Sequence, residues 1–335
     1  WRDDPTPYRV WVSEIMLQQT QVSAVVPFFD RFLARFPDVS FLAAAKQEAV
    51  LTAWSGLGYY ARARNLQKAA QTVVRDRGGA LPESREGWLQ LPGIGPYTAG
   101  AIASIAQGQP EAIVDGNVER VLSRVLGLQR GVRALKSTRT FRDQIWKASG
   151  EWVRAAHDRK GSPSVANQAL MELGATVCAP VSPRCQDCPI GRAGCRAASS
   201  GKHEFWKSYP GKKPRPATVQ VDEGAVAYVS RDGGIYLCCG LCRRDERPGR
   251  WRAGLWDLPV ARLADLRPAE AIVTKYVVTK HLVNRTTEVV RLRRRHELAA
   301  KCADGRWFGL KTIVGGDAAV GAPVRKIARL LLERK

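Results

Sequence analysis

Apolar residues repeat at the spacing of an amphipathic helix through most of the first 200 residues of the chain. The run from Tyr8 to Val26 has this spacing. Pro27 should interrupt it before a second helix over 28–36, because proline lacks the N–H that a helix interior needs. Further helices are predicted over 40–54, 61–76, 84–90, 96–107, 116–127, 138–156 and 164–177. The first part of the chain is therefore expected to be all-α.

The pattern changes after residue 200. Residues 200–218 are basic, contain several prolines and lack periodicity, which is typical of a linker. Gly224–Ser230 and Gly234–Cys239 then read as strands on either side of an Asp-Gly-Gly turn, which predicts a β-hairpin. Two more strands are expected over Tyr276–Thr279 and Thr286–Leu292, and a closing helix over Val324–Glu333. The sequence thus predicts a multidomain chain with a helical domain over 1–199, a linker over 200–218 and a smaller α+β domain over 219–335.

A turn rich in glycine and proline lies between two of the expected helices, at Leu91–Gly100. Gly93 and Gly95 permit a tight turn with positive φ, and Pro96 suits the first turn of the helix that follows. Glycines in front of a helix leave its backbone N–H groups open to a phosphate. The segment indicates either a phosphate-binding turn or an ordinary connection between two helices.

The net charge of the chain favours the first of these alternatives. There are 53 Lys and Arg residues against 31 Asp and Glu residues, which gives a net charge of +22. An excess of this size predicts a polyanionic partner, and nucleic acid fits best. A membrane surface would also attract it, but the sequence has no run of about 18 apolar residues that could span one. No membrane partner is expected.

Four cysteines come close together in the chain, at Cys178, Cys185, Cys188 and Cys195. They form a single Cys-x2-Cys pair with a lone cysteine on each side. Zinc sites usually carry two such pairs, so the spacing favours a [4Fe–4S] cluster held by four thiolates over a zinc ion or unliganded cysteines. It also favours a reducing compartment over a disulfide framework.

The chain resembles the helix–hairpin–helix DNA glycosylases that carry an iron–sulfur cluster, and among them the MutY-type adenine DNA glycosylases. The segments that carry this resemblance are Trp1-Arg2, Trp11–Val22, Gly56–Leu66, Leu91–Gly100 and Val114–Val118. The resemblance implies base excision repair by hydrolysis of the N-glycosidic bond of adenine in double-stranded DNA. The adenine would lie opposite 8-oxoguanine or guanine, and a [4Fe–4S] cluster would be bound by the four cysteines.

The resemblance places the chemistry on two carboxyl groups. Glu14 matches the general acid, and its apolar neighbours should raise its pKa by desolvation and keep a proton available. Asp115 would stabilise the sugar cation or bond to it transiently, and it could also be simply the N-cap of the next helix. Asn117 and Tyr97 match positions that assist around the sugar and the water.

Tyr97 also separates related activities. Relatives of the endonuclease III type place a lysine at this point, whose amine forms a Schiff base and cuts the strand. Because a tyrosine cannot do this, we expect a monofunctional enzyme. The alternatives are an endonuclease III-like lyase and a damage-binding module that has lost catalysis, since a scaffold alone does not prove activity.

Further residues would bind the DNA and the base. Gln19 and Tyr59 match side chains that wedge into the base stack beside the flipped adenine, although Tyr59 could also be a packed aromatic at a helix end. Gly93 and Gly95 belong to the turn that would grip the DNA backbone. The adenine pocket would be lined by Trp1, Arg2, Leu17, Gln168 and Met171.

The second domain resembles the Nudix-like domain with which these glycosylases inspect 8-oxoguanine, most clearly in Ala253–Pro259. A Nudix hydrolase needs a helix dense in glutamates to bind Mg²⁺, and none follows Pro259. We therefore expect recognition of the lesion and no hydrolysis by this domain. Thr279 is the residue that best fits the family's loop for touching 8-oxoguanine. The expected protein is a monomer in the bacterial cytoplasm, at the nucleoid, or in the nucleus or mitochondrion of a eukaryote.

Overall fold

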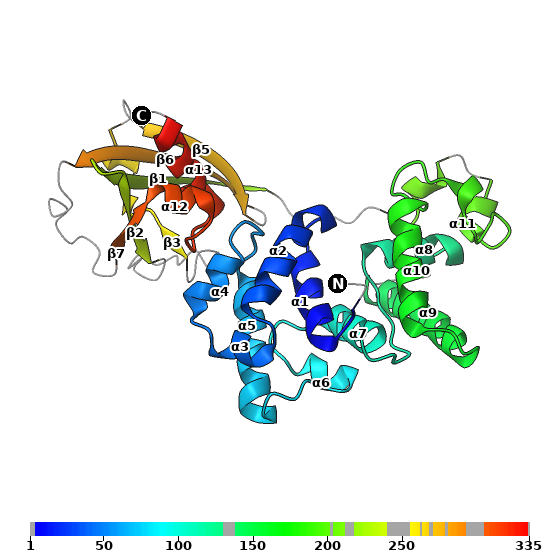
Figure 1. Cartoon of the computed structure of the whole chain (residues 1–335). Coiled ribbons are helices and arrows are strands. Elements are labelled where there is room, and N and C mark those ends of the chain that lie inside the picture. Colours follow the sequence, from blue (N-terminus) through cyan, green and yellow to red (C-terminus); the bar gives the residue numbers. More distant parts are fainter. Residues whose placement is uncertain are drawn as a thin grey trace. The chain divides into compact units, whose positions relative to one another are not determined.

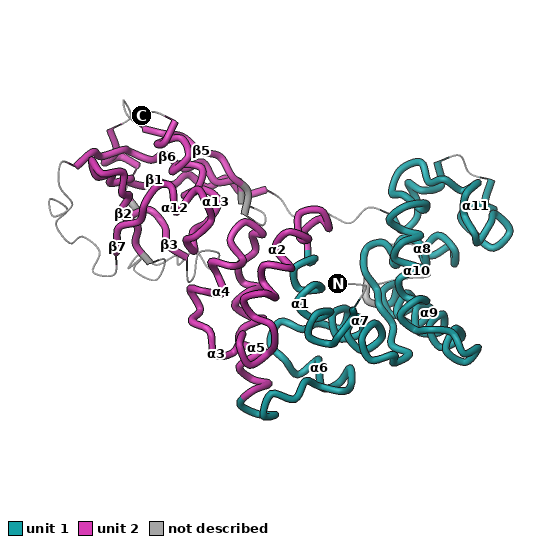
Figure 2. The backbone as a smooth tube through the Cα atoms, viewed as in Figure 1, with its two compact units in different colours: residues 1–18, 75–214 teal, residues 19–74, 215–335 magenta. Residues whose placement is uncertain are grey.

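The structure, shown in Figure 1, is a computed structural model of the chain. It describes residues 4–129, 138–201, 204–211, 218–239, 255–261, 263–267, 271–278, 281–292 and 305–333. The chain forms two compact units, and each unit is built from two separate stretches of sequence (Figure 2). The first unit contains residues 1–18 and 75–214, and the second contains residues 19–74 and 215–335. The α-helices of the first part of the chain end at the predicted limit of 199, and the strands of the sheet begin at the predicted limit of 219. The predicted domain boundaries themselves stay a prediction.

The first 200 residues are helical, as predicted. Their described α-helices are α1 (Pro7–Leu17), α2 (Val22–Arg35), α3 (Val39–Ala44), α4 (Gln47–Ala53), α5 (Ala61–Arg77), α6 (Arg85–Leu89), α7 (Pro96–Ile105), α8 (Gly116–Leu126), α9 (Thr138–Asp158), α10 (Pro163–Thr176) and α11 (Arg196–Ser199). Short 3₁₀ turns add η1 (Cys185–Asp187) and η2 (Phe205–Lys207). None of the described helices is long and apolar enough to cross a membrane.

The first break in the helical pattern lies earlier than predicted. Pro27 does not interrupt a helix, because it lies inside α2. The chain instead leaves helical geometry after Leu17, where Gln19 has a left-handed φ of 57°. A proline inside a helix removes a hydrogen bond and bends it, whereas a left-handed residue ends the helix outright. The predicted helix over 40–54 is also divided, because Ala45 and Lys46 are extended between α3 and α4.

Helix α1 packs against α7 in the core of the first unit. The fully buried Trp11 meets Trp88 edge to face, with ring centroids 5.4 Å apart. At the end of α1, Gln18 Nε2 donates a hydrogen bond of 3.4 Å to the hydroxyl oxygen of Thr98 on α7. Gly100 permits a close approach on the other side of α7, because a Cβ atom there would lie 2.2 Å from the carbonyl oxygen of Ala112. Helix α7 therefore lies directly against the segment that leads into α8.

A mixed sheet forms the centre of the C-terminal part of the second unit. Its described strands are β1 (Val219–Ser230), β2 (Gly234–Cys239), β3 (Trp256–Asp257), β4 (Val260–Ala261), β5 (Ala271–Val278), β6 (His281–Leu292) and β7 (Gly305–Gly309). The order is β3-β2-β1-β6-β5, with β4 paired to β1 and β7 paired to β2. The predicted hairpin is confirmed by the antiparallel pair Val229 and Ile235. Strands β1 and β6 are parallel, so the connection between them crosses over.

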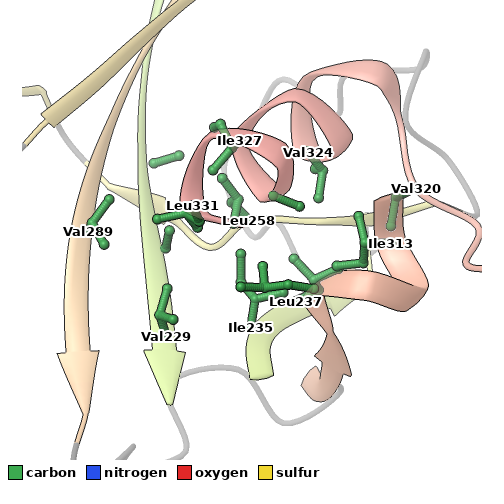
Figure 3. Close-up of a cluster of buried hydrophobic side chains, with 14 of the residues drawn as sticks. Val229, Ile235, Leu237, Leu258, Val289, Ile313, Val320, Val324, Ile327 and Leu331 are labelled. Carbon is green, nitrogen blue, oxygen red and sulfur yellow. The ribbon is translucent and has the colours of Figure 1, made fainter. Parts of the chain in front are cut away.

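Two helices cover one face of this sheet, α12 (Leu310–Gly315) and α13 (Ala322–Glu333). Figure 3 shows apolar side chains of both helices meeting those of the strands. The helices contribute Ile313, Val324, Ile327 and Leu331, and the strands contribute Val229, Ile235, Leu237 and Val289. This buried cluster confirms the predicted α+β character of the C-terminal part and the predicted closing helix.

The same unit joins the turn between α4 and α5 to the C-terminal module. The Tyr60 hydroxyl donates a hydrogen bond of 2.9 Å to the carbonyl oxygen of Val320. The Ser55 hydroxyl donates one of 3.3 Å to the carbonyl oxygen of Ala318 and accepts one from the Arg325 guanidinium. Residues 55–60 are thus hydrogen-bonded to residues 318–325, more than 250 positions later in the sequence.

Candidate active site

Asp115 is the N-cap of helix α8, as its sequence position predicts. Its Oδ1 atom accepts a hydrogen bond of 2.7 Å from the backbone N–H of Val118. Its Oδ2 atom accepts one of 2.9 Å from the side-chain amide of Asn117. Both oxygens are therefore held by N–H donors at the N-terminus of α8. The structure brings Asp115 and Asn117 together, as the resemblance implies.

Two buried polar side chains hold the backbone just before Asp115, and the sequence pattern predicts neither contact. The Asn167 side chain on α10 accepts a hydrogen bond of 3.2 Å from the Ile113 N–H, and it donates one of 2.8 Å to the carbonyl oxygen of Glu111. The Ser149 hydroxyl on α9 donates one of 2.9 Å to the carbonyl oxygen of Ile113. Asn167 is only 1% exposed. Both are polar residues among apolar helix positions, a pattern that does not show which backbone group they bind.

Arg120 is a third residue whose contacts at the site are not predicted from the sequence. Its Nη2 atom donates hydrogen bonds of 2.9 Å to Asn117 Oδ1 and 2.7 Å to the carbonyl oxygen of Gly174. Its Nε atom donates one of 2.8 Å to the carbonyl oxygen of Cys178. Burial and the nearby Arg124 lower the pKa of the Arg120 guanidinium, and Cys178 and Asp115 oppose that shift. Arg120 therefore joins the Asp115–Asn117 pair to the start of the cysteine segment.

Glu14 lies on α1 and is buried. It is 6% exposed, and the adjacent Ile15 and Met16 are also buried. Helix α1 packs against α7, α7 against α10 and α10 against α8. The helices that carry Glu14, Tyr97 and Asp115 therefore belong to one packed group in the first unit.

The candidate adenine-pocket residues are partly described. The Tyr97 hydroxyl on α7 contacts the Met171 sulfur on α10 at 3.8 Å, which brings these two predicted residues together. Gln168 is half-buried, and its side-chain amide donates a hydrogen bond of 2.8 Å to the Ser164 hydroxyl. Leu17 is half-buried at the end of α1. Trp1 and Arg2 lie outside the described residues.

The glycine turn differs in one respect from the prediction. Gly93 has a positive φ of 80°. Gly95 instead is the N-cap of α7 with extended backbone, at φ −99° and ψ 176°. Pro96 occupies the first turn of α7, as predicted. Apart from its chain neighbours, no atom lies within 4 Å of the position that a Cβ at Gly95 would take, and Gly95 itself is half-buried.

Gln19 and Tyr59 are both exposed and both strained. Gln19 has a φ of 57° and Tyr59 a φ of 48°, a region that residues other than glycine rarely occupy. Tyr59 is 49% exposed, so it is not a buried aromatic residue. Such strain persists only where surrounding contacts enforce it, and it is enriched at functional sites.

The four clustered cysteines line one pocket in the first unit, together with Arg124 and Phe205. Burial raises the pKa of the Cys185 thiol, and the three other cysteines add to the shift. The Arg124 guanidinium lies 3.3 Å from the Cys178 sulfur. Four thiols around one pocket suit an iron–sulfur cluster in chemistry and number. In the part of the chain that the structure describes, no group of three or more His, Cys, Asp or Glu side chains has the geometry of a metal site as it stands.

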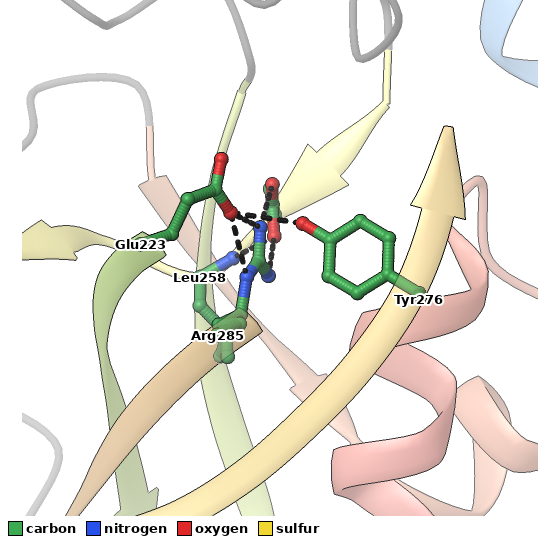
Figure 4. Close-up of polar contacts among 5 residues, drawn as sticks. Glu223, Leu258, Tyr276 and Arg285 are labelled. Atoms are coloured by element: carbon green, nitrogen blue, oxygen red, sulfur yellow. Dashed lines mark hydrogen bonds and ion pairs between the residues drawn. The ribbon is translucent and has the colours of Figure 1, made fainter. Parts of the chain in front are cut away.

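The second unit contains a buried ion pair between Arg285 and Asp257, the acidic residue of the Ala253–Pro259 segment. Figure 4 shows Arg285 together with Glu223 and Tyr276. Arg285 is 1% exposed and donates hydrogen bonds of 2.7 and 3.1 Å to the two carboxylate oxygens of Asp257. It also contacts Glu223, which accepts a hydrogen bond of 2.8 Å from the Tyr276 hydroxyl. Burial alone lowers the pKa of the Arg285 guanidinium, but Asp257, with smaller contributions from Tyr276 and Glu223, more than reverses this and raises it. Both carboxylate oxygens of Asp257, on β3, are therefore bound to Arg285, on β6.

Two expectations for this module cannot be placed. Thr279, the candidate contact to 8-oxoguanine, lies outside the described residues, as do Ala253 and Gly254. The residues on either side of Thr279 and Lys280, Val278 and His281, pair across strands β5 and β6.

The comparison with protein families identifies the helical domain. Residues 12–148 match the family described as "HhH-GPD superfamily base excision DNA repair protein". Residues 12–148 of the chain therefore form a domain of this superfamily.

Within that class, the chain is similar to adenine DNA glycosylases. It is 46% identical over 202 residues to the adenine DNA glycosylase of Homo sapiens, across 60% of this chain and 35% of the relative. It is 44% identical over 266 residues to that of Mus musculus, across 79% of this chain and 47% of the relative. The chain thus spans less than half the length of these curated relatives. The predicted resemblance to MutY-type glycosylases is confirmed.

A solved structure supports the fold of the helical part. The structure of a thermostable thymine-DNA glycosylase matches with a TM-score of 0.51 at 27% identity. The match covers 59% of this chain and 87% of the other. The predicted helix–hairpin–helix fold is confirmed.

Proposed function

We propose that this protein is an adenine DNA glycosylase. It hydrolyses the N-glycosidic bond of adenine in double-stranded DNA, where the adenine lies opposite 8-oxoguanine or guanine. The observation that carries this proposal is the Asp115 carboxylate, which Val118 N–H and Asn117 hold in a helix group that also carries the buried Glu14. Two carboxyl groups in different environments can divide the work of an acid and of a cation stabiliser.

Glu14 is the proton donor in this proposal. Adenine is a poor leaving group, so it must gain a proton as the bond to the sugar breaks. Burial removes the water that stabilises a carboxylate, which favours the protonated form of Glu14. Asp115 stabilises or bonds the sugar cation, while Asn117 and Tyr97 assist around the sugar and the water.

The enzyme acts as a hydrolase without strand cleavage. Tyr97 lies on the first turn of α7, where it contacts Met171, and its phenol cannot form the Schiff base that a lyase needs. Met171, Gln168, Leu17, Trp1 and Arg2 are the proposed contacts to the base. Gly93 and Gly95 form the turn in front of α7 that would bind a phosphate, as helix N-termini do.

We propose that Cys178, Cys185, Cys188 and Cys195 hold a [4Fe–4S] cluster. The support is the pocket that all four line. When bound, the cluster would cross-link residues 178–195, and its binding free energy would stabilise this segment.

The Nudix-like module is the proposed reader of 8-oxoguanine, with Thr279 as its contact. Asp257 is tied to Arg285, which supports a binding role over hydrolysis for the segment around it. The protein acts as a monomer in the compartment that holds the DNA, the bacterial nucleoid or a eukaryotic nucleus or mitochondrion. The charge of +22 supports DNA as its partner.

The test is a pair of glutamate substitutions in the full chain. Glu14→Gln keeps size and polarity but removes the transferable proton, so adenine release in single-turnover assays should be abolished while duplex binding persists. Glu151→Gln, an exposed change on α9, should leave release unchanged. Release by Glu14→Gln within a few-fold of the parent would refute the role of Glu14. Covalent trapping of the parent protein by borohydride would favour the lyase alternative instead.

A further inference from the structure

Arg62 lies beneath the two strained, exposed residues of the second unit. It is on the first turn of α5 and is 9% exposed. Its Nη2 atom donates hydrogen bonds of 3.1 Å to the Thr20 hydroxyl and 3.3 Å to the carbonyl oxygens of both Leu57 and Gly58. Thr20 follows Gln19, and Gly58 precedes Tyr59. One guanidinium therefore holds both loops.

The same guanidinium also supports the Tyr59 ring directly. Its central carbon lies 5.4 Å from the centroid of the Tyr59 ring and 5.5 Å from that of the Trp54 ring. Trp54 is fully buried, and its Nε1 atom donates a hydrogen bond of 3.1 Å to the carbonyl oxygen of Gly58. Tyr59 thus rests on a cation that is itself fixed by a buried ring.

Backbone strain explains why such support is needed. Gln19 and Tyr59 both have positive φ, and Gly56 and Gly58, at 118° and 69°, bring the chain into Tyr59. Residues in this region relax unless their surroundings hold them. The contacts of Arg62 reach the residue after Gln19 and the two residues before Tyr59, so they act where the strain occurs.

Packing alone does not explain an arginine at this position. Burial lowers the pKa of Arg62 to about 10, with Tyr59 opposing the shift, so the group stays charged at neutral pH. Burial of a charge costs desolvation free energy, and an apolar side chain would fill the same space without that cost. The planar guanidinium instead combines several donors with a flat face for stacking, which neither lysine nor an apolar residue does.

We propose that Arg62 is a positioning residue that fixes Gln19 and Tyr59 relative to each other, so that both enter the base stack together as adenine leaves it. This inference rests on the proposed function, which assigns the two side chains as wedges. Filling the hole left by an extruded base offsets the free energy of unstacking, and it requires both wedges in place at once. Arg62 therefore acts on extrusion of the base and not on the chemistry.

The test compares two adenine substrates in single-turnover assays with the full chain. In the first duplex adenine is paired with guanine, and in the second it is an unpaired bulge that needs little extrusion. Arg62→Lys should slow release from the paired duplex by about tenfold or more and from the bulge much less. The control is Arg75→Lys, an exposed position on the same helix, which should change neither rate. Equal loss on both substrates, or no loss on the paired one, would overturn the proposal.

A fluorescence measurement separates this inference from the proposed function. With 2-aminopurine beside the target adenine, binding of the parent protein should raise the emission as the stack opens. Arg62→Lys should reduce that rise at saturating protein, measured at a temperature where circular dichroism shows both proteins to be folded. If the parent protein opens the stack but releases no adenine, the proposed activity is wrong. The emission of Arg62→Lys relative to the parent still tests the positioning role in that case. If the parent protein gives no rise at all, the positioning role is wrong as well.

Discussion

Gly174 offers a direct way to disturb the Asp115 site from a neighbouring helix. A Cβ atom at this position of α10 would lie 2.6 Å from the Asn117 Cβ and 3.1 Å from its Cα atom, where ordinary contact begins at 3.4 Å. Asn117 is in the first turn of α8 and bonds both Asp115 and Arg120, so no flexible side-chain end can yield. In Gly174→Ala, one helix must shift by about 1 Å relative to the other.

The effects on stability and on rate should differ in size. Overpacking of this kind typically costs about 1–3 kcal/mol. Alanine recovers about 1 kcal/mol of that in a helix interior, so the net loss of stability should be small. A misplacement of about 1 Å in a catalytic group, by contrast, can lower the rate by about 10²-fold. We therefore expect Gly174→Ala to be folded and to release adenine about a hundred times more slowly.

The assay is single-turnover adenine release with protein in excess, paired with denaturant unfolding of the same preparation. Gly150→Ala on α9 is the matched control, because the three atoms nearest to its new Cβ all belong to the flexible guanidinium of Arg154, the nearest at 3.3 Å. That control should keep the parent rate. A Gly174→Ala rate within about threefold of the parent would refute the reasoning that α10 sets the place of Asn117.

Two further predictions concern the ion pair and the cysteines. Arg285→Met leaves Asp257 and Glu223 buried without their cation, so denaturant unfolding of the C-terminal module should show a loss of about 3–5 kcal/mol. Adding Asp257→Asn should recover part of it, and a double variant no more stable than the single one would count against the pairing. The purified parent protein should contain about four irons per chain, and Cys185→Ser should lose them. Metal analysis that finds stoichiometric zinc and no iron would contradict the cluster.

Helix α8 shows what the sequence predicts well. Its start is set by an aspartate cap and its end by Gly127, whose φ is 68°, and both signals are local. The break after α1 depends instead on Gln19, whose conformation is held by a loop that Arg62 also binds. Periodicity carries no information about such a contact, so the sequence placed the break at Pro27.

The candidate active site likewise contains residues whose contacts follow from the sequence and residues whose contacts do not. Asp115 and Asn117 lie two residues apart, and their pairing follows from the cap and the family motif. Asn167 and Arg120 act on backbone groups 54 residues away in the chain, and Ser149 on one 36 residues away. Which carbonyl a buried polar side chain meets is decided by helix packing, so these supporting residues could not be read from the sequence.

The division of the second unit into two stretches has a consequence for synthesis on the ribosome. Residues 19–74 emerge early, but their partners, residues 215–335, come last. At about 5–20 residues per second, the intervening stretch takes on the order of ten seconds to make. During that time the Tyr60 hydroxyl lacks the carbonyl of Val320 that it bonds in the finished protein. The unit with Glu14 and Asp115 can be complete before the loop that carries Tyr59 gains its final support.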